Sequence, residues 1–217
     1  MGRMLTTGVL MLITLAIASC DFLTLPAVSQ AAAPGSVLFS DDFSNPNSGW
    51  DTWSKHDSGV TYKDGALHID IQEVQYSAWS RSGRRYDDAH IRVDAWRAGG
   101  PEDNDMGIIC RYKDENNYYS FLISSDGYGG IVKVKDGQYH LLTGETLVYI
   151  EAIKTGSETN NIGADCVGHS LRLLVNGALV ASAEDSDFIT GEVGLIAGSY
   201  DLPGVEIAFD NFVVLKP

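Results

Sequence analysis

The amino-acid sequence predicts an all-β protein, built as a two-sheet antiparallel β-sandwich. Apolar and polar residues alternate along short segments such as residues 66–71 and 90–96, which is the period of a half-buried strand. Pairs of Asp or Asn with Gly stand between such segments, and these pairs suit the positive φ angles of tight hairpins. No segment keeps a helical period over three turns, so the pattern favours a sandwich over alternating strands and helices.

Five segments are the clearest predicted strands, and four turns are the clearest predicted hairpin connections. The strands are residues 66–71, 90–96, 106–112, 118–123 and 171–175. The turns are Asp64-Gly65, Asp126-Gly127, Asp136-Gly137 and Asn176-Gly177. We expect one folded domain over residues 37–217, which is long enough to bury a substantial core.

The first residues follow the order of a secretory signal. A basic leader with Arg3 precedes an apolar segment over residues 4–17, and small residues then lead to Cys20. This is the arrangement of a signal peptide. The run Ile17-Ala18-Ser19-Cys20 resembles a bacterial lipobox, in which the cysteine is lipidated and becomes the mature N-terminus.

We therefore predict a lipoprotein signal peptide at residues 1–19, followed by a lipidated cysteine and a flexible tether over residues 20–36. The protein would be extracytoplasmic and lipid-anchored to the bacterial cell membrane. Two alternatives stay open. Cleavage near Ala31-Ala32-Ala33 would release a soluble secreted protein, whereas a retained anchor would need roughly 20 apolar residues, more than this segment offers.

The chain is acidic, with a formal net charge of −14. An acidic surface repels nucleic acid and anionic lipid. We therefore expect neither nucleic-acid binding nor membrane binding through a cluster of basic residues. Ordinary solubility, or calcium held in loops, accounts for the excess of acids. The sequence leaves the oligomeric state open.

The cysteines predict a disulfide. If Cys20 carries lipid, Cys110 and Cys166 remain, and exported chains meet oxidising conditions. We expect these two to be joined, with two separate buried thiols as the alternative. A zinc site is not predicted, because neither cysteine has a Cys or His partner at ligand spacing.

A family resemblance is carried by five segments in order. They are residues 39–43 with Gly49-Trp50, 107–112, 117–121, 193–197 and 209–214. Together they resemble the concanavalin A-like lectin/glucanase superfamily, near its laminin-G-like and 3-keto-disaccharide hydrolase-like members. The resemblance implies a jelly roll of two stacked sheets with about six or seven strands each. It also implies that the first and last strands pair, and that a sugar site lies on the concave sheet.

No catalytic residues are predicted. Retaining glycosidases of this superfamily place carboxylates on one strand as Glu-x-Asp-x-(x)-Glu, a spacing suited to a nucleophile and an acid/base. Residues 184–187 lack the second Glu of that pattern, and residues 102–105 are expected in a loop flanked by Gly and Pro. The sequence also contains no Gly-x-Ser-x-Gly, no His-Glu-x-x-His and no phosphate-binding glycine loop.

The candidate ligand-binding residues centre on Arg111, a charge within an otherwise apolar predicted strand. Strict alternation places Arg111 on one face with Gly107 and Ile109, and Cys110 and Tyr112 on the other. On a shallow cleft, its guanidinium could bind hydroxyls or a carboxylate. The aromatic platforms that we expect beside it are Tyr76, Trp79, Tyr119 and Tyr128. The alternative is an Arg paired within the fold, with aromatic residues in the core.

Calcium is the expected ion, because Asp side chains and loop carbonyls supply the oxygen ligands that it prefers. Pairing of the first and last strands would bring Asp41 and Asp42 close to Asp210, so these three are the preferred site. The loop at residues 102–105 is the second candidate. Plain solvated acids are the alternative in both places.

These observations predict an exported, lipid-anchored β-sandwich that binds a carbohydrate or a cell-envelope glycan without cleaving it. One alternative is a glycoside or 3-keto-sugar hydrolase with a site that the motifs do not reveal. Another is a structural or adhesive envelope module that binds protein.

Overall fold

The computed structural model describes residues 1–2 and 32–217. Residues 3–19 of the predicted signal peptide, Cys20 and most of the predicted tether lie outside the described residues. Residues from Ala32 to Pro217 form one compact unit. No helix in the described residues is long and apolar enough to cross a membrane.

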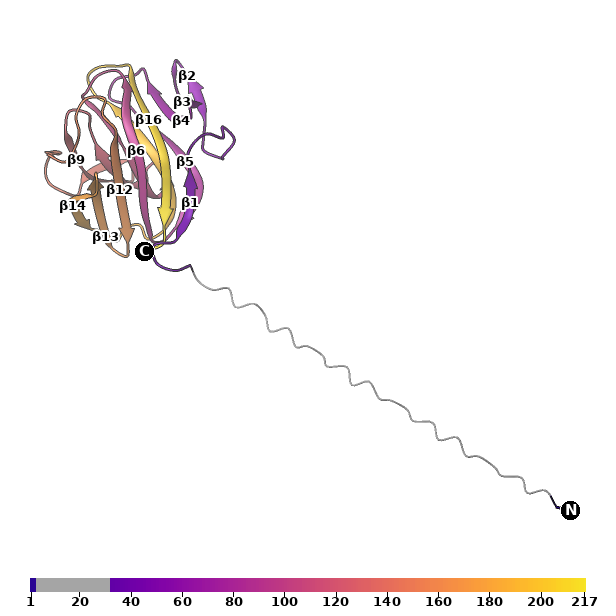
Figure 1. The fold of residues 1–217 in the computed structure, drawn as a ribbon. Helices are drawn as coiled ribbons and strands as arrows, with labels where there is room; N and C mark the ends of the chain where they lie inside the picture. Colours follow the sequence, from indigo (N-terminus) through magenta and orange to yellow (C-terminus); the bar gives the residue numbers. More distant parts are fainter. Residues whose placement is uncertain (3–31) are drawn as a thin grey trace. The chain divides into compact units, whose positions relative to one another are not determined.

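Two antiparallel sheets make up this unit, which confirms the all-β sandwich prediction. The larger, sheet A, has nine strands, and Figure 1 shows several of them side by side in one layer. In spatial order they are β14 (Ala178–Glu184), β13 (Ser170–Val175), β12 (Asn160–Val167), β6 (Ala89–Gly99), β16 (Val205–Leu215), β4 (Ala66–Ile71), β3 (Ser58–Lys63) and β2 (Trp53–Lys55), with β1 (Val37–Asp41) also paired to β16.

The smaller sheet, sheet B, has seven strands. Its spatial order is β10 (Gln138–Leu141), β9 (Tyr128–Lys135), β8 (Asn117–Ile123), β7 (Asn104–Asp114), β15 (Gly191–Ser199) and β5 (Ser77–Tyr86), with β11 (Val148–Tyr149) also paired to β9. The larger sheet exceeds the six or seven strands implied by the resemblance because the short strands β1 and β2 extend it.

Three of the four predicted turns have positive φ at both of their residues, whereas at Asp126-Gly127 only Gly127 does, within the longer loop between β8 and β9. At Asn176 and Gly177, φ is 51° and 85°, and the flanking residues Val175 and Ala178 are paired. In the turns at residues 64–65 and 136–137, both residues likewise have positive φ. Two central residues with positive φ match the twist of the strands that they connect.

The chain closes on itself through the first and last strands. β1 pairs antiparallel with β16, so that Asp41 lies opposite Phe212, as the resemblance implied. Trp50 packs edge-on against Phe212, with ring centroids 4.8 Å apart. Phe39 of β1 packs against the same ring, with centroids 6.0 Å apart, so the N-terminal strand is fixed by both backbone pairing and aromatic packing.

The core lies between the two sheets and contains most of the buried apolar side chains. From sheet B it takes Ile108 and Leu195, and from sheet A it takes Val93 and Ile207, all of them fully buried. The predicted disulfide joins Cys110 of β7 to Cys166 of β12 through this core. It is a covalent link between the sheets.

We expect the double variant Cys110→Ala with Cys166→Ala to lose about 2–4 kcal/mol of unfolding free energy, because the bond closes a loop between residues 56 apart in sequence and restrains the unfolded chain. Urea unfolding of the oxidised protein measures the loss. Wild type unfolded in reductant is the control and should match the variant. An unchanged midpoint would contradict the stabilising role.

Candidate functional site

Strand β7 carries one extra residue near its end. Opposite β15, Ile109 pairs with Gly194 and Tyr112 pairs with Glu192, so three steps along β7 match two along β15. Arg111 lies in this bulge with a φ of 53°. Because a bulge shifts the alternation of side chains, Ile109 and Tyr112 both lie in the apolar cluster on the outer face of sheet B.

Arg111 is buried, so the prediction that it binds a ligand on an open face is wrong. Its side chain is 1% exposed. The guanidinium donates to the carbonyl oxygens of Asp87 and Phe188, each at 3.0 Å, and to Asp88 Oδ1 at 3.2 Å. The prediction assumed unbroken alternation, which the bulge at this position removes.

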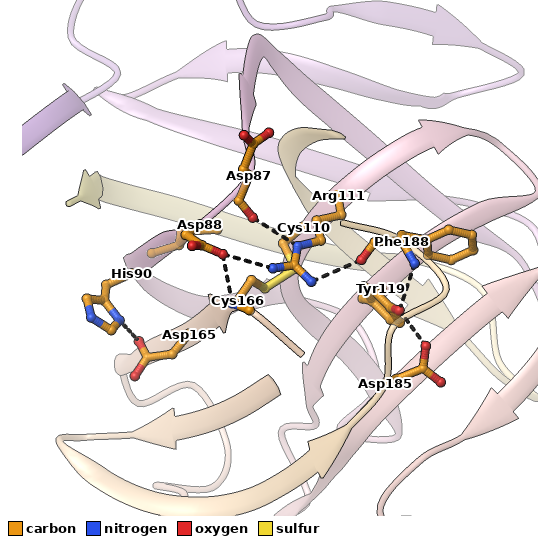
Figure 2. Close-up of a disulfide and its surroundings, with 12 residues drawn as sticks. Asp87, Asp88, His90, Cys110, Arg111, Tyr119, Asp165, Cys166, Asp185 and Phe188 are labelled. Atoms are coloured by element: carbon orange, nitrogen blue, oxygen red, sulfur yellow. Dashed lines mark hydrogen bonds and ion pairs between the residues drawn. A yellow bond between two sulfur atoms is a disulfide. The ribbon is translucent and has the colours of Figure 1, made fainter. Parts of the chain in front are cut away.

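Figure 2 shows the Arg111 guanidinium between Asp88 and the Phe188 carbonyl, beside the disulfide. Asp88 Oδ1 also accepts the Gly168 N–H at 2.7 Å. Gly191 lies so close that a Cβ there would stand 2.2 Å from the Arg111 carbonyl carbon. Arg111 therefore links several loops at one end of the sandwich, and its role is structural.

Tyr119 is also buried, so its prediction as an aromatic platform is wrong. Its ring is fully enclosed and packs on Phe188 with centroids 5.0 Å apart. The hydroxyl donates to Asp185 Oδ1 at 2.5 Å and accepts the Phe188 N–H at 3.1 Å (Figure 2). Tyr118, one residue earlier, faces the outer side of sheet B instead.

Three aromatic rings gather on the outer face of sheet B. The centroid of Trp79 lies 6.4 Å from that of Tyr112 and 6.2 Å from that of Tyr118, and the two tyrosines stack at 5.8 Å. Both tyrosines are buried, and burial raises the pKa of each hydroxyl. Trp79 is the ring of this cluster that remains partly exposed.

A hollow of about 500 Å³ opens beside this cluster, and we call it the Trp79 hollow. It is lined by Tyr76 and Trp79, two predicted ligand-binding residues, together with Arg81 and Tyr112. Tyr76 is 43% exposed. Arg81 donates to Asp51 Oδ2 at 2.7 Å and lies over the Tyr112 ring, 5.3 Å from its centroid. The hollow thus combines aromatic surface with oriented polar groups.

A second hollow, of about 640 Å³, crosses sheet B from β5 to β10, and we call it the Asp105 hollow. Its floor is apolar, with Leu122, Val132 and Ile196 from three strands. The two hollows share Ser77. The volume of each hollow lies within the roughly 300–1,000 Å³ that binding sites for small molecules occupy.

Asp105 is a carboxylate in the lining of this hollow, and its pKa is shifted. Its Oδ2 accepts the Tyr200 hydroxyl at 2.8 Å. Its Oδ1 is enclosed and has no hydrogen-bond partner among the described residues. Burial, together with the charges of Asp103 and Asp126, outweighs the Tyr200 bond and raises the pKa of Asp105 to about 6. A carboxyl with such a pKa in a hollow is typical of a functional site.

Asp105 was predicted only as part of a loop that could hold calcium, because the sequence places residues 102–105 in a loop. The structure begins β7 at Asn104, so the Asp105 side chain stands on a strand. Asn104 anchors this start by donating from Nδ2 to the Pro101 carbonyl at 2.7 Å and to Ser125 Oγ at 3.0 Å. The sequence signal was the apolar run that directly follows Asp105.

Tyr128, the last predicted platform, lines a smaller hollow of about 150 Å³. It is 43% exposed and packs edge-on against Tyr149, with centroids 5.8 Å apart. This hollow shares Leu147 and Tyr200 with the Asp105 hollow. Of the five predicted ligand-binding residues, Tyr76, Trp79 and Tyr128 therefore line hollows that have lining residues in common, whereas the two buried ones do not.

The side chains of the predicted calcium ligands accept hydrogen bonds from nearby N–H groups. They are not arranged as the roughly six to eight oxygen ligands that Ca²⁺ prefers. The two Asp41 oxygens accept the Phe43 N–H at 2.9 Å and the Trp50 Nε1–H at 3.0 Å. Asp42 and Asp210 each accept a backbone N–H from within two residues. Nowhere in the described part of the chain are three or more His, Cys, Asp or Glu grouped to hold a metal. Calcium binding stays a prediction.

No family model and no curated protein matches the chain. Among solved structures, the carbohydrate-binding module CBM66 from Bacillus subtilis matches with a TM-score of 0.63 and 16% identity, over 78% of this chain and 96% of that one. The β-glucanase of Bacillus licheniformis matches with a TM-score of 0.61 and 15% identity, over 87% of this chain and all of that one.

These matches, at such low identity, concern the fold. The chain has a concanavalin A-like β-sandwich fold. The GH43 protein BlXynB from Bacillus licheniformis contains a similar sandwich, with a TM-score of 0.62 and 15% identity, but this chain spans 39% of its length. Because one fold serves both binding modules and enzymes, the activity has to be argued from the site.

We expect Asp105→Asn to stabilise the protein at neutral pH. The folded-state pKa of Asp105 is raised from 3.8 to about 6, so its contribution to stability is fully present below the unfolded pKa and is lost as the pH rises through the folded one. The variant keeps an acceptor for Tyr200. Its free energy of unfolding should exceed that of the wild type by up to about 3 kcal/mol above pH 6, and by little below pH 3.8. Urea midpoints of both proteins across the pH range measure this difference, and parallel curves would contradict it.

Proposed function

We propose that the outer face of sheet B binds a carbohydrate chain and does not cleave it. The observation that carries this proposal is the pair of hollows that share the lining residue Ser77 and combine the partly exposed Trp79 with polar groups such as Arg81 and Gln75. The likeness of the fold to a carbohydrate-binding module supports the same conclusion.

The chemistry of these hollows suits a sugar. A pyranose ring presents C–H groups on its face, and aromatic rings such as Trp79 and Tyr139 offer apolar surface of matching size. Tyr139 lines the Asp105 hollow and is 65% exposed. Sugar hydroxyls both donate and accept hydrogen bonds, so Ser77, Gln75 and Asp105 in the same hollow provide partners at the edges of the ring.

We expect Trp79→Ala to weaken oligosaccharide binding at least tenfold, since it removes the exposed ring of the cluster. A glycan array screened with the purified chain identifies a ligand, and calorimetry then compares the variants. Trp96→Ala is the matched control, because Trp96 is also partly exposed but lies on β6 of sheet A.

Equal loss in both tryptophan variants would point to general destabilisation and contradict the assignment. Absence of any glycan ligand would remove the proposal and favour a protein partner.

Glycoside hydrolysis is a second candidate, favoured by one observation. Asp105 has the raised pKa that a general acid needs, and Glu145 lines the same hollow as a second carboxylate. Release of new reducing ends from the array ligands, abolished by Asp105→Asn, would replace the binding proposal with this one.

The proposed setting is the outer side of a bacterial membrane, with the protein held by a lipid on Cys20. The lipobox-like run at residues 17–20 supports it, and the disulfide between the sheets agrees with an oxidising compartment.

We expect Cys20→Ser to abolish fatty-acid labelling and to move the protein from the membrane fraction to the soluble or unprocessed fraction. A conservative Ser19→Ala change in the same run is the control and should retain labelling. Unchanged labelling and membrane association in Cys20→Ser would overturn the anchor.

A further inference from the structure

A small hollow of about 210 Å³ lies on sheet A, and we call it the Arg172 hollow. Its lining residues come from three neighbouring strands and are His90, Asp165, Val167, Ser170 and Arg172. The strand register places His90 opposite Asp165, and Asp165 opposite Arg172. Residues directly opposite each other share one face of a sheet, so basic side chains flank this carboxylate on both sides.

The charge of Asp165 is compensated from the side of β6. Its Oδ1 accepts a hydrogen bond from Arg92 Nη1 at 2.7 Å and lies 2.8 Å from His90 Nδ1, the contact that Figure 2 draws. Gly163 leaves room for this arrangement, since a Cβ there would stand 3.0 Å from Arg92 Cδ. The Asp165 side chain is only 12% exposed. It therefore presents little uncompensated negative charge to the hollow.

Arg172, on the other side of Asp165, lacks a counter-charge. Its side chain is exposed, and no carboxylate among residues 32–217 forms an ion pair with it. Five other arginines do have such a partner: Arg81, Arg85, Arg92, Arg97 and Arg111. Glu184 lies opposite Ser170 on β14 but does not line the hollow. In a chain with 29 acidic and 15 basic residues, this guanidinium is a local surplus of positive charge.

His90 brings a second donor to the hollow. Its Nδ1 is enclosed beside Asp165, so the exposed third of the side chain belongs to the rest of the ring, which includes Nε2. Once the ring is protonated, Nδ1–H faces the carboxylate and Nε2–H can donate to a ligand. The charged groups nearest the ring are Asp165, Arg92 and Arg172, while Leu215 of β16 lies opposite His90 on its other side and brings no charge.

These donors suit a tetrahedral oxyanion. A guanidinium donates two parallel N–H bonds to such a group, and the Ser170 hydroxyl and the His90 ring add donors from neighbouring positions. The hollow is smaller than the roughly 300–1,000 Å³ typical of sites for drug-sized ligands, so it fits one sulfate or phosphate group better than a sugar ring. A cation would be repelled by Arg172, and a neutral hydroxyl would leave its charge without a partner.

We propose that the Arg172 hollow binds a sulfate or phosphate group. Arg172 supplies the pairing charge, Ser170 and protonated His90 donate hydrogen bonds, and Asp165 is a positioning residue that holds the ring. The site lies on sheet A, so it is separate from the glycan surface proposed on sheet B and does not depend on it.

Titration of the ¹⁵N-labelled full chain with sodium sulfate at constant ionic strength, followed by NMR, tests the site. We expect saturable shifts of the amides around Ser170 and Arg172, although a chain with a net charge of −14 repels anions in general. Arg172→Ala should weaken binding at least tenfold, and Arg172→Lys, which keeps the charge but loses the fork, should weaken it less.

Arg84→Ala is the matched control, because Arg84 also forms no ion pair in the described part of the chain and lies over the Phe39 ring. It should bind sulfate as the wild type does. Shifts that do not saturate, or an equal loss in Arg84→Ala and Arg172→Ala, would overturn the proposal, since either result shows a general charge effect.

The pH dependence of sulfate binding tests the role of His90, because sulfate keeps its own charge over the range in which histidine titrates. We expect the affinity to rise from about pH 8 to about pH 5 and His90→Gln to remove this rise. His140→Gln, on β10 of sheet B, should retain it. A flat profile in the wild type would contradict the assignment of the ring as a donor.

Two further ligands distinguish the sources of the bound group. Glucose 6-sulfate and glucose 6-phosphate carry it on a sugar, whereas inorganic sulfate and phosphate supply it as a free ion. Tighter binding of the esters, lost in Arg172→Ala, would support a group carried by a larger molecule, and equal affinity would support the ion itself. Failure of all four to bind would overturn the proposal and leave the proposed function on sheet B in place.

Discussion

The register of strand β7 is the constraint on which the rest of the structure depends. Before the bulge, its side chains alternate between the core and the outer face of sheet B, so Cys110 points inward to the disulfide. The extra residue then turns Arg111 toward the loops at the end of the sandwich and returns Tyr112 to the outer face. The same strand therefore provides the disulfide through Cys110, the buried contacts of Arg111, and Tyr112 in the lining of the Trp79 hollow.

The two ends of β7 serve different purposes. At its end, the guanidinium of Arg111 is satisfied within the fold by Asp88 and by backbone carbonyls, which makes that region rigid and closed. At its beginning, Asp105 keeps an oxygen without a partner, and the fold bears the cost of a buried acid whose pKa is raised. Such local conflicts are expected mainly at functional or strained sites.

Most of the fold could be predicted from the sequence, because it is encoded locally. Alternation located β4 and β6, and the Asn176-Gly177 pair fixed the β13–β14 hairpin through its positive φ angles. The disulfide followed from counting cysteines in a chain that its first residues predict to be exported. These features depend on residues close together in sequence or on simple chemistry.

The site was predicted in part, because it depends on register between distant strands. Trp79 and Tyr76, which we expected as aromatic platforms beside Arg111, line a hollow that Arg111 does not line. Alternation placed Arg111 on an open face, because nothing in the local sequence pattern indicates the bulge. Asp105 lay beyond the predicted strand, and its contact with Tyr200 joins residues far apart in sequence. Such pairings become visible only when β7 and β15 are seen side by side.

The central claim is that a glycan lies on the outer face of sheet B. Titration of the ¹⁵N-labelled protein with a glycan ligand, followed by NMR, tests it most directly, because the indole N–H signals of Trp79 and Trp96 report on opposite sheets. The account predicts that the Trp79 signal shifts with the amides around Asp105 and Ile196 while the Trp96 signal stays in place. Shifts confined to Trp96 and the outer face of sheet A would contradict it.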